Sequence, residues 1–108
     1  MANTTTVGAN TITIVLDGST DWSYETDTEF TEGIKVSSVQ FMPSAINDVF
    51  IARDGSASGA ILHDSGVVAS VRPWYDPVDP PQWERLYIDA TDLTLDTAAS
   101  ALVIIRFV

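Results

Sequence analysis

The excess of β-branched residues is the feature that most restricts how this chain can fold. Threonine, valine and isoleucine supply 32 of its 108 residues, whereas leucine, glutamate and lysine, which favour helices, supply only 6, 4 and 1. A side chain that branches at Cβ suits a pleated strand better than a helix. The chain also contains no convincing helical pattern of ten residues or more. The composition therefore predicts an all-β protein.

Alternating apolar positions indicate where the strands lie. Ile12, Ile14 and Leu16 recur with a period of two, which predicts a strand over residues 11–17. In residues 34–41 the apolar positions change phase near Ser37-Ser38, and this predicts a strand that contains a bulge. The last segment, 100–108, is apolar in both phases apart from Arg106, so we expect it to form a central strand.

Turn residues separate the remaining strands. Residues 47–53 and 59–64 flank a segment of Asp, Gly, Ser and Ala, which predicts a hairpin. After Ser65-Gly66, residues 67–72 are expected to be the next antiparallel strand, and 83–89 a further one. The chain therefore contains several short strands at close intervals.

Two segments do not follow the strand pattern, namely 18–32 and 73–83. Both are expected to be long loops, and the four prolines between positions 73 and 81 exclude a central strand there. The whole pattern predicts a single small antiparallel β-sandwich, jelly-roll-like, over residues 11–108. An extended N-terminal arm, residues 1–10, precedes it, and a small β-barrel is the alternative fold.

Charge and composition exclude several classes of function. Fifteen acidic residues against five basic ones give a formal net charge of −10, which opposes binding to nucleic acid. The absence of cysteine excludes disulfides, thiolate nucleophiles and cysteine metal sites. The longest apolar run is five residues, 101–105, and the first ten residues lack the features of a signal peptide. We therefore expect a soluble protein without a membrane partner.

No pattern of catalytic residues is present. His63 is the single histidine, and residues 55–59 fail the Gly-x-Ser-x-Gly motif because the third position is Ala57. A glycosidase would need two carboxylates across a cleft, which a small sandwich rarely builds. We therefore predict no enzyme activity, no catalytic residues and no cofactor.

Metal binding is considered because aspartate is abundant. The loop that begins at Asp54 matches part of the calcium-binding loop pattern but has Ser65 where a bidentate glutamate is required. Asp89, Asp92 and Asp96 could converge on a turn, and residues 21–32 form an acidic run without a basic residue. Solvated carboxylates explain both groups more simply. No metal ligands are predicted.

Aromatic residues in the two irregular segments are the candidate partner-binding residues. Aromatic rings held by stiff loops can anchor a protein surface or support a sugar ring, while the alternative is that they cap the ends of a small core. The candidates are Trp22, Tyr24, Trp74, Tyr75 and Trp83.

The segment from Gly33 to Ser65 contains a distinctive order of short motifs. A strand is followed by Phe41-Met42-Pro43-Ser44, then Asn47-Asp48-Val49, then Arg53-Asp54-Gly55-Ser56 and a glycine at position 59. This succession resembles small accessory virion proteins of tailed bacteriophages, and so do the closing segments 86–89 and 102–108. The resemblance covers about two-thirds of the chain and implies no catalytic residues.

The resemblance implies a non-enzymatic capsid decoration or cement protein that binds and stabilises the head lattice. Its partners would be the major capsid protein or other virion proteins, and its location the virion, assembled in the host cytoplasm. A monomer and a homotrimer both agree with the sequence. A phage tail or neck accessory protein and a small carbohydrate-binding β-sandwich module are the alternative functions.

Overall fold

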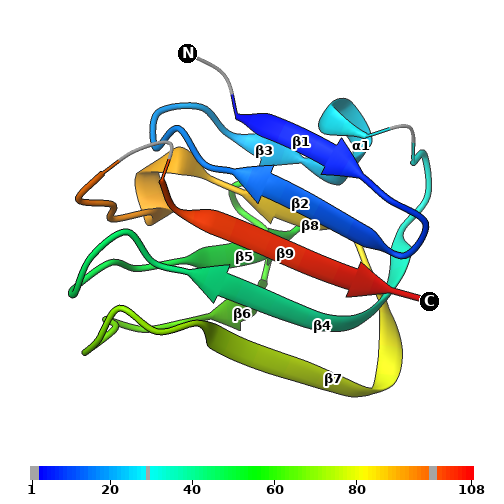
Figure 1. Ribbon diagram of the computed structural model, residues 1–108. Coiled ribbons are helices and arrows are strands. Elements are labelled where there is room, and N and C mark those ends of the chain that lie inside the picture. The colour runs from blue at the N-terminus through cyan, green and yellow to red at the C-terminus, as the bar shows by residue number, and fades with distance from the viewer. Residues whose placement is uncertain (1–2, 29, 98–99) are drawn as a thin grey trace.

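The computed structural model describes residues 3–28, 30–97 and 100–108. Within them the strands form two antiparallel sheets that pack face to face (Figure 1). Sheet A contains, in spatial order, β1 (Thr4–Val7), β2 (Thr11–Val15), β9 (Leu102–Phe107), β4 (Ile34–Met42) and β7 (Trp74–Glu84). Sheet B contains β3 (Trp22–Ser23), β8 (Leu86–Ile88), β5 (Ile51–Asp54) and β6 (Ile61–Asp64). A four-residue helix, α1 (Tyr24–Asp27), and a 3₁₀ turn, Ala90–Asp92, complete the elements.

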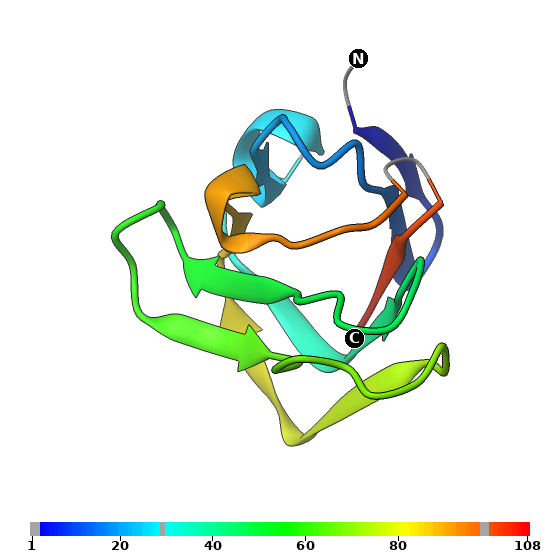
Figure 2. The same ribbon diagram turned by 90° about the vertical axis from the view of Figure 1, so that its left-hand side faces the viewer.

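The strand order is that of a jelly roll with one added edge strand. Strands β2-β9-β4-β7 form one layer and β3-β8-β5-β6 the other, so the chain repeatedly crosses between the layers (Figure 2). Over the described residues neither sheet closes on itself, because β1 and β7 are the edges of sheet A and β3 and β6 those of sheet B. The predicted antiparallel β-sandwich is therefore confirmed, and the barrel is not formed.

Several strand predictions are confirmed in detail. The pairing of β4 shifts between Val36 and Ser38, where the phase change of the sequence predicts a bulge. Strand β9 lies between β2 and β4, as its two apolar phases predict. Strands β5 and β6 pair as a hairpin, although each has only four residues.

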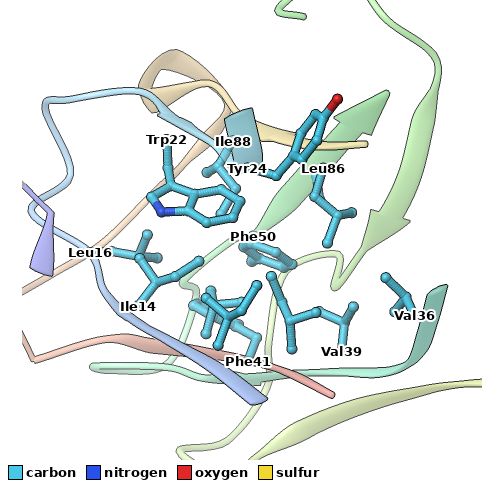
Figure 3. Packing of buried hydrophobic residues seen from close by; sticks show 14 of the residues in the cluster. Ile14, Leu16, Trp22, Tyr24, Val36, Val39, Phe41, Phe50, Leu86 and Ile88 are labelled. Carbon is cyan, nitrogen blue, oxygen red and sulfur yellow. The ribbon is translucent and has the colours of Figure 1, made fainter. Parts of the chain in front are cut away.

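The core lies between the two sheets and contains the alternating residues of β2, β4 and β9 (Figure 3). Phe41 on β4 stacks on Phe50, with ring centroids 5.2 Å apart, and Trp22 of sheet B is fully buried nearby. Each fully buried large apolar side chain contributes about 2 kcal/mol. The other fully buried large residues are Ile12, Ile14, Leu16, Val36, Val39, Leu86, Ile88, Val103 and Ile105.

The prediction of a strand over residues 67–72 is wrong. This segment connects β6 of sheet B to β7 of sheet A, so it passes between layers and cannot stay in register with either one. Val68 is buried and its N–H donates to the Asp48 carbonyl, but Val67 and Val71 are largely exposed. The β-branched composition therefore suggests a strand that the crossover does not allow.

The prediction of a loop over residues 73–83 is also wrong, because Trp74–Glu84 forms strand β7. The prolines do exclude a central position, and β7 is an edge strand. An edge strand pairs on one side only. A proline there, which has no N–H, therefore costs little when its nitrogen faces away from the neighbouring strand. Residues 78–81 lie outside the ladder, between the pairs Val36↔Gln82 and Ser38↔Pro77, and the Asp79–Pro80 bond in this part is cis.

The N-terminal segment is extended, but part of it belongs to sheet A. Residues Thr4–Val7 form β1 and pair with β2, and Thr5 Oγ1 accepts a hydrogen bond of 3.0 Å from the Trp22 indole. Met1 and Ala2 of the predicted arm lie outside the described residues. In the predicted loop 18–32, β3 and α1 are formed, and Glu29 lies outside the described residues.

Asp48 should contribute strongly to folding because its buried carboxylate joins two loops. It accepts hydrogen bonds from Ser44 N (2.7 Å), Ser44 Oγ (2.6 Å), Ala45 N (3.2 Å) and Asp96 N (3.1 Å). We expect Asp48→Ala to lower the free energy of unfolding by about 2 kcal/mol in urea denaturation. The exposed Asp79→Ala is the control and should change it little.

The effect of Asp48 should also depend on pH. Burial raises the pKa of this carboxyl, but the hydrogen bonds to its charged form lower it further, so the net pKa lies below 3.8. The stabilisation is therefore present above about 3.8 and is lost as the pH falls through the lower folded value. An Asp48→Ala protein as stable as the wild type at neutral pH would contradict this account.

Candidate functional site

The outer face of sheet A is defined by strand register, because paired residues point to the same side of a sheet. Core residues such as Ile14, Val103 and Phe41 point inward, so their neighbours in sequence point outward. Three rows of side chains then cross this outer face. They are Val15, Leu102 and Met42; Thr13, Ile104, Gln40 and Tyr75; and Thr11, Arg106, Ser38 and Pro77.

No carboxylate occurs in these three rows, although the chain has fifteen. The two acidic residues of β7 that pair with β4, Asp76 and Glu84, point inward, and Asp79 lies in the unpaired part of that strand. Arg106 is exposed and donates to Gln40 Oε1 at 3.3 Å, and Lys35 lies on the same face opposite Trp83. This face is therefore uncharged or basic in a strongly acidic protein.

Arg106 thus contacts an amide rather than a carboxylate. Arg106 is exposed, so its head also reaches water, and the register explains why no acid lies beside it on this face. Arg106 pairs with Ser38 and lies diagonally from Gln40, so no acid is near it on this face.

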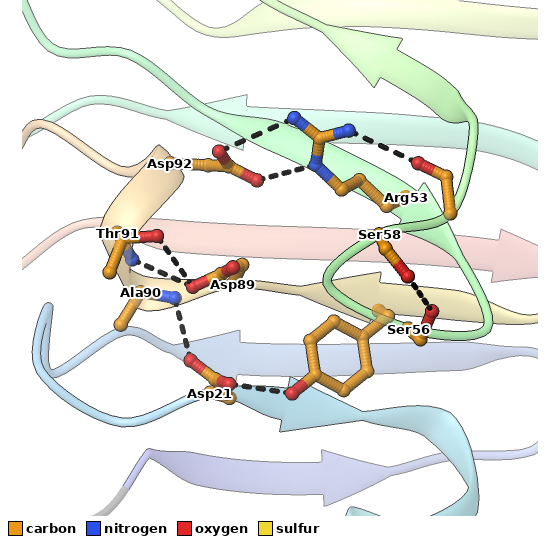
Figure 4. Close-up of polar contacts among 10 residues, drawn as sticks. Asp21, Arg53, Ser56, Ser58, Asp89, Ala90, Thr91 and Asp92 are labelled. Carbon is orange, nitrogen blue, oxygen red and sulfur yellow. Dashed lines mark hydrogen bonds and ion pairs between the residues drawn. The ribbon is translucent and has the colours of Figure 1, made fainter.

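The opposite surface, over sheet B, is rich in paired charges (Figure 4). Arg53 Nε lies 2.7 Å from Asp92 Oδ2, and Arg53 Nη1 donates to the Gly59 carbonyl at 3.1 Å. Asp89 accepts hydrogen bonds from the N–H and hydroxyl of Thr91. These carboxylates hold the turn after β8 against sheet B.

Asp21 has a similar structural role. It accepts hydrogen bonds from Tyr87 Oη at 2.5 Å and from Ala90 N at 2.8 Å (Figure 4). These bonds favour the charged form and lower the pKa of Asp21. The same bond, together with burial and nearby acids, raises the pKa of Tyr87 to about 12. The loop before β3 is thereby fixed to β8.

His63 joins the two sheets at their β6 and β7 edges. Its ring is almost fully buried, with Nδ1 2.5 Å from Asp76 Oδ2 and Nε2 2.8 Å from Glu84 Oε1. Only the protonated ring can donate to both carboxylates at once. Burial lowers the pKa of His63, but the two bonds and charges raise it more, so the net pKa lies above 6.5.

This arrangement, which we call the His63 clamp, was not predicted from the sequence. A signal was present, since Asp76 and Glu84 are eight positions apart, an even spacing, in what proves to be one strand. The proline-rich composition hid that strand, and no serine nucleophile contacts the ring among the described residues. The clamp therefore fixes β7 to β6 through two hydrogen bonds.

The five predicted aromatic residues are not brought together. Trp22 and Tyr24 are buried in the core, which removes them from any docking surface. Trp74 is partly buried, with its ring 6.3 Å from that of Phe50. These three follow the core-capping alternative. Trp22 lies on the two-residue strand β3, Tyr24 on the helix α1 and Trp74 on the edge strand β7, and the sequence pattern predicts none of these elements.

Tyr75 and Trp83 are the exposed members of the set. Their side chains are 56% and 71% exposed, and both lie on β7 on the outer face of sheet A. They are the two of the five candidates whose rings remain available for contact with a partner.

The aspartates considered for calcium take part in separate contacts. Asp89 caps the 3₁₀ turn, Asp92 pairs with Arg53, and the Asp96 N–H donates to Asp48. Within residues 3–28, 30–97 and 100–108, no three histidine or acidic side chains gather in a way that could hold a metal ion.

No protein-family model, curated protein or solved structure matches this chain. None of the helices in the described parts has the length and apolar character needed to cross a bilayer. The functional argument therefore depends on the geometry of the outer face of sheet A.

Proposed function

We propose that this protein is a non-enzymatic virion structural protein, a capsid decoration protein that binds and stabilises the head lattice through the outer face of sheet A. The observation that carries the proposal is the lack of carboxylates in the three rows of that face in a chain of net charge −10. The resemblance of residues 33–65 to phage virion proteins supports it. Jelly rolls are used by viral capsid domains and by lectins, so the fold alone does not choose between them.

The charge distribution gives the docking face a physical advantage. Elsewhere the acidic surface repels other copies and keeps the protein soluble before assembly. On the outer face of sheet A, Lys35 and Arg106 are the charged groups; both lie toward the C-terminal end of β9, and the apolar side chains Ile104 and Leu102 follow along the same strand. A partner surface that is apolar or weakly acidic is therefore favoured on this face alone.

The edge strand β1 extends this surface. It contains three threonines and a valine, with neither proline nor charge, and it pairs with β2 on one side. An edge of this kind can accept a strand from another protein, whereas the prolines of β7 oppose such pairing. The arm predicted from the sequence thus acts, in this proposal, as the open edge of sheet A.

Co-sedimentation tests the proposed function. The purified protein is mixed with capsids assembled from the major capsid protein encoded in the same genome, and the mixture is centrifuged. We expect saturable binding at a fixed ratio per capsid subunit, because each lattice position offers the same surface. Weak single contacts would be strengthened if several copies act together as an oligomer.

Two results would contradict the proposal. Protein that stays in the supernatant at all concentrations would exclude a decoration function. Binding to purified tails but not to capsids would instead favour the tail or neck accessory protein.

A further inference from the structure

A pocket of about 430 Å³ lies where the chain leaves sheet A and enters sheet B. Its lining residues come from four segments: the end of β7, the link to β8, the start of β4 and the end of β5. They are Glu32, Gly33, Asp54, Trp83 and Arg85. The volume lies within the usual range for small-molecule sites.

Glycines allow Arg85 to lie close to the backbone at the rim of this pocket. A Cβ atom on Gly33 would lie 2.9 Å from the Glu84 carbonyl oxygen and 3.2 Å from Arg85 Cγ. Gly55 has a φ of +76°, its N–H donates to the Arg85 carbonyl at 2.7 Å, and a Cβ there would lie 3.1 Å from Arg85 Nη2. Arg85 Nε in turn lies 3.9 Å from Asp54 Oδ1. The backbone at the rim is therefore fixed by the Gly55–Arg85 hydrogen bond, while the Arg85 and Asp54 side chains, 61% and 49% exposed, remain accessible to a ligand.

Trp83 supplies the apolar part of the pocket. Its side chain is 71% exposed, so the apolar surface of the indole remains in contact with water in the free protein. A ligand with one flat apolar face would release that water, which is favourable. The remaining lining groups are polar: two carboxylates that accept hydrogen bonds and a guanidinium that donates them.

We infer that this pocket binds a neutral saccharide. The C–H face of a pyranose ring stacks on the Trp83 indole, while its hydroxyl groups donate to Glu32 and Asp54 and accept from Arg85. A hydroxyl both donates and accepts, so it can use all three groups. This second binding function is argued from the pocket alone, although Trp83 also lies on the outer face of sheet A.

The charges of the lining decide against other ligand classes. Glu32 and Asp54, in a protein of net charge −10, repel phosphates and acidic sugars. The same carboxylates attract a cationic peptide, but Arg85 opposes it within the pocket, and a single indole does not form an aromatic cage around an ammonium group. An uncharged ligand with many hydroxyl groups avoids both penalties.

An array of neutral oligosaccharides built from hexoses and N-acetylhexosamines tests the inference. Each hit is then titrated in solution against the full chain, with tryptophan fluorescence as the readout, because a stacked Trp83 should change its emission. We expect binding in the millimolar to micromolar range and a loss of about tenfold or more in Trp83→Ala. Glu32→Gln should also weaken binding, because the amide oxygen of glutamine accepts a hydrogen bond but lacks the charge of the carboxylate.

The matched control is Tyr75→Ala. Tyr75 is an exposed aromatic residue on the same strand and face but outside the pocket, so its removal should leave saccharide binding unchanged. An array without a hit, or a hit that Trp83→Ala retains, would overturn the inference. Binding of lysine-rich peptides with no binding of glycans would also overturn it and would identify the pocket as a cation site.

Discussion

Replacing Ile104 with aspartate should reduce binding to the capsid lattice by about tenfold or more. Ile104 lies in the middle row of the outer face of sheet A, on the central strand β9, between Thr13 and Gln40. A carboxylate at this position would have to lose its hydration on docking without an assured partner. The loss is measured by co-sedimentation of the variant with assembled capsids.

Ile61→Asp is the matched control for this experiment. Ile61 is 49% exposed and lies on β6, opposite Arg53, on the outer face of sheet B. The Ile61→Asp substitution adds the same charge as Ile104→Asp, but to a surface that already contains many acids. Capsid binding should therefore stay near the wild-type value. Equal binding by Ile104→Asp and the wild type would show that docking uses another surface. Urea denaturation of both variants verifies that each is folded.

Replacing His63 with leucine should lower the free energy of unfolding by about 3 kcal/mol near pH 6. The substitution leaves the Glu84 carboxylate, which is only 9% exposed, facing an apolar side chain. Asp76 is 36% exposed and can regain water, so most of the cost arises at Glu84. Urea denaturation of the wild type and the variant measures the difference.

The difference in unfolding free energy between the wild type and His63→Leu should depend on pH. The pKa of His63 is raised in the folded protein, so its stabilising contribution is complete below the unfolded value of about 6.5. It is lost as the pH rises through the higher folded pKa, because the neutral ring can donate to only one carboxylate. The wild type should therefore lose stability relative to His63→Leu as the pH rises above about 6.5 and through the higher folded pKa.

A second substitution separates the charge effect from loss of packing. Glu84→Gln in the His63→Leu background removes the unpaired buried charge and should restore part of the lost stability. If His63→Leu unfolds at the same urea concentration as the wild type at pH 6, the clamp has no stabilising role. If the second substitution restores nothing, the loss arises from packing alone.

The parts of the fold that were predictable from sequence are those in which burial follows a local period. Ile12, Ile14 and Leu16 are buried as their spacing predicts, and the bulge in β4 follows from one change of phase. Strand β7 was not predictable in this way. Its prolines indicate a loop, and only its place at an edge, with one paired side, makes the strand tolerable.

The candidate site was less predictable than the fold. Of the five aromatic residues chosen from the sequence, Tyr75 and Trp83 are exposed on one face, while Trp22 and Tyr24 are in the core. Burial of Trp22 depends on its pairing with Ile88, 66 residues later in the chain, and no local pattern reports such a pairing.

The sequence by itself determined the all-β class, the alternating core positions, the central place of the last strand and the high negative charge. These properties depend on side-chain type and on spacings of a few residues. Only the tertiary structure decided which surface lacks carboxylates, that His63 lies between Asp76 and Glu84, and that Trp83 and Asp54 line one pocket. Each of these depends on strand pairing or on a crossing between sheets, which bring together residues that are far apart in the chain. The acidic residues are therefore unevenly distributed. Carboxylates support the loops and sheet B, and the three rows of side chains on the outer face of sheet A contain none.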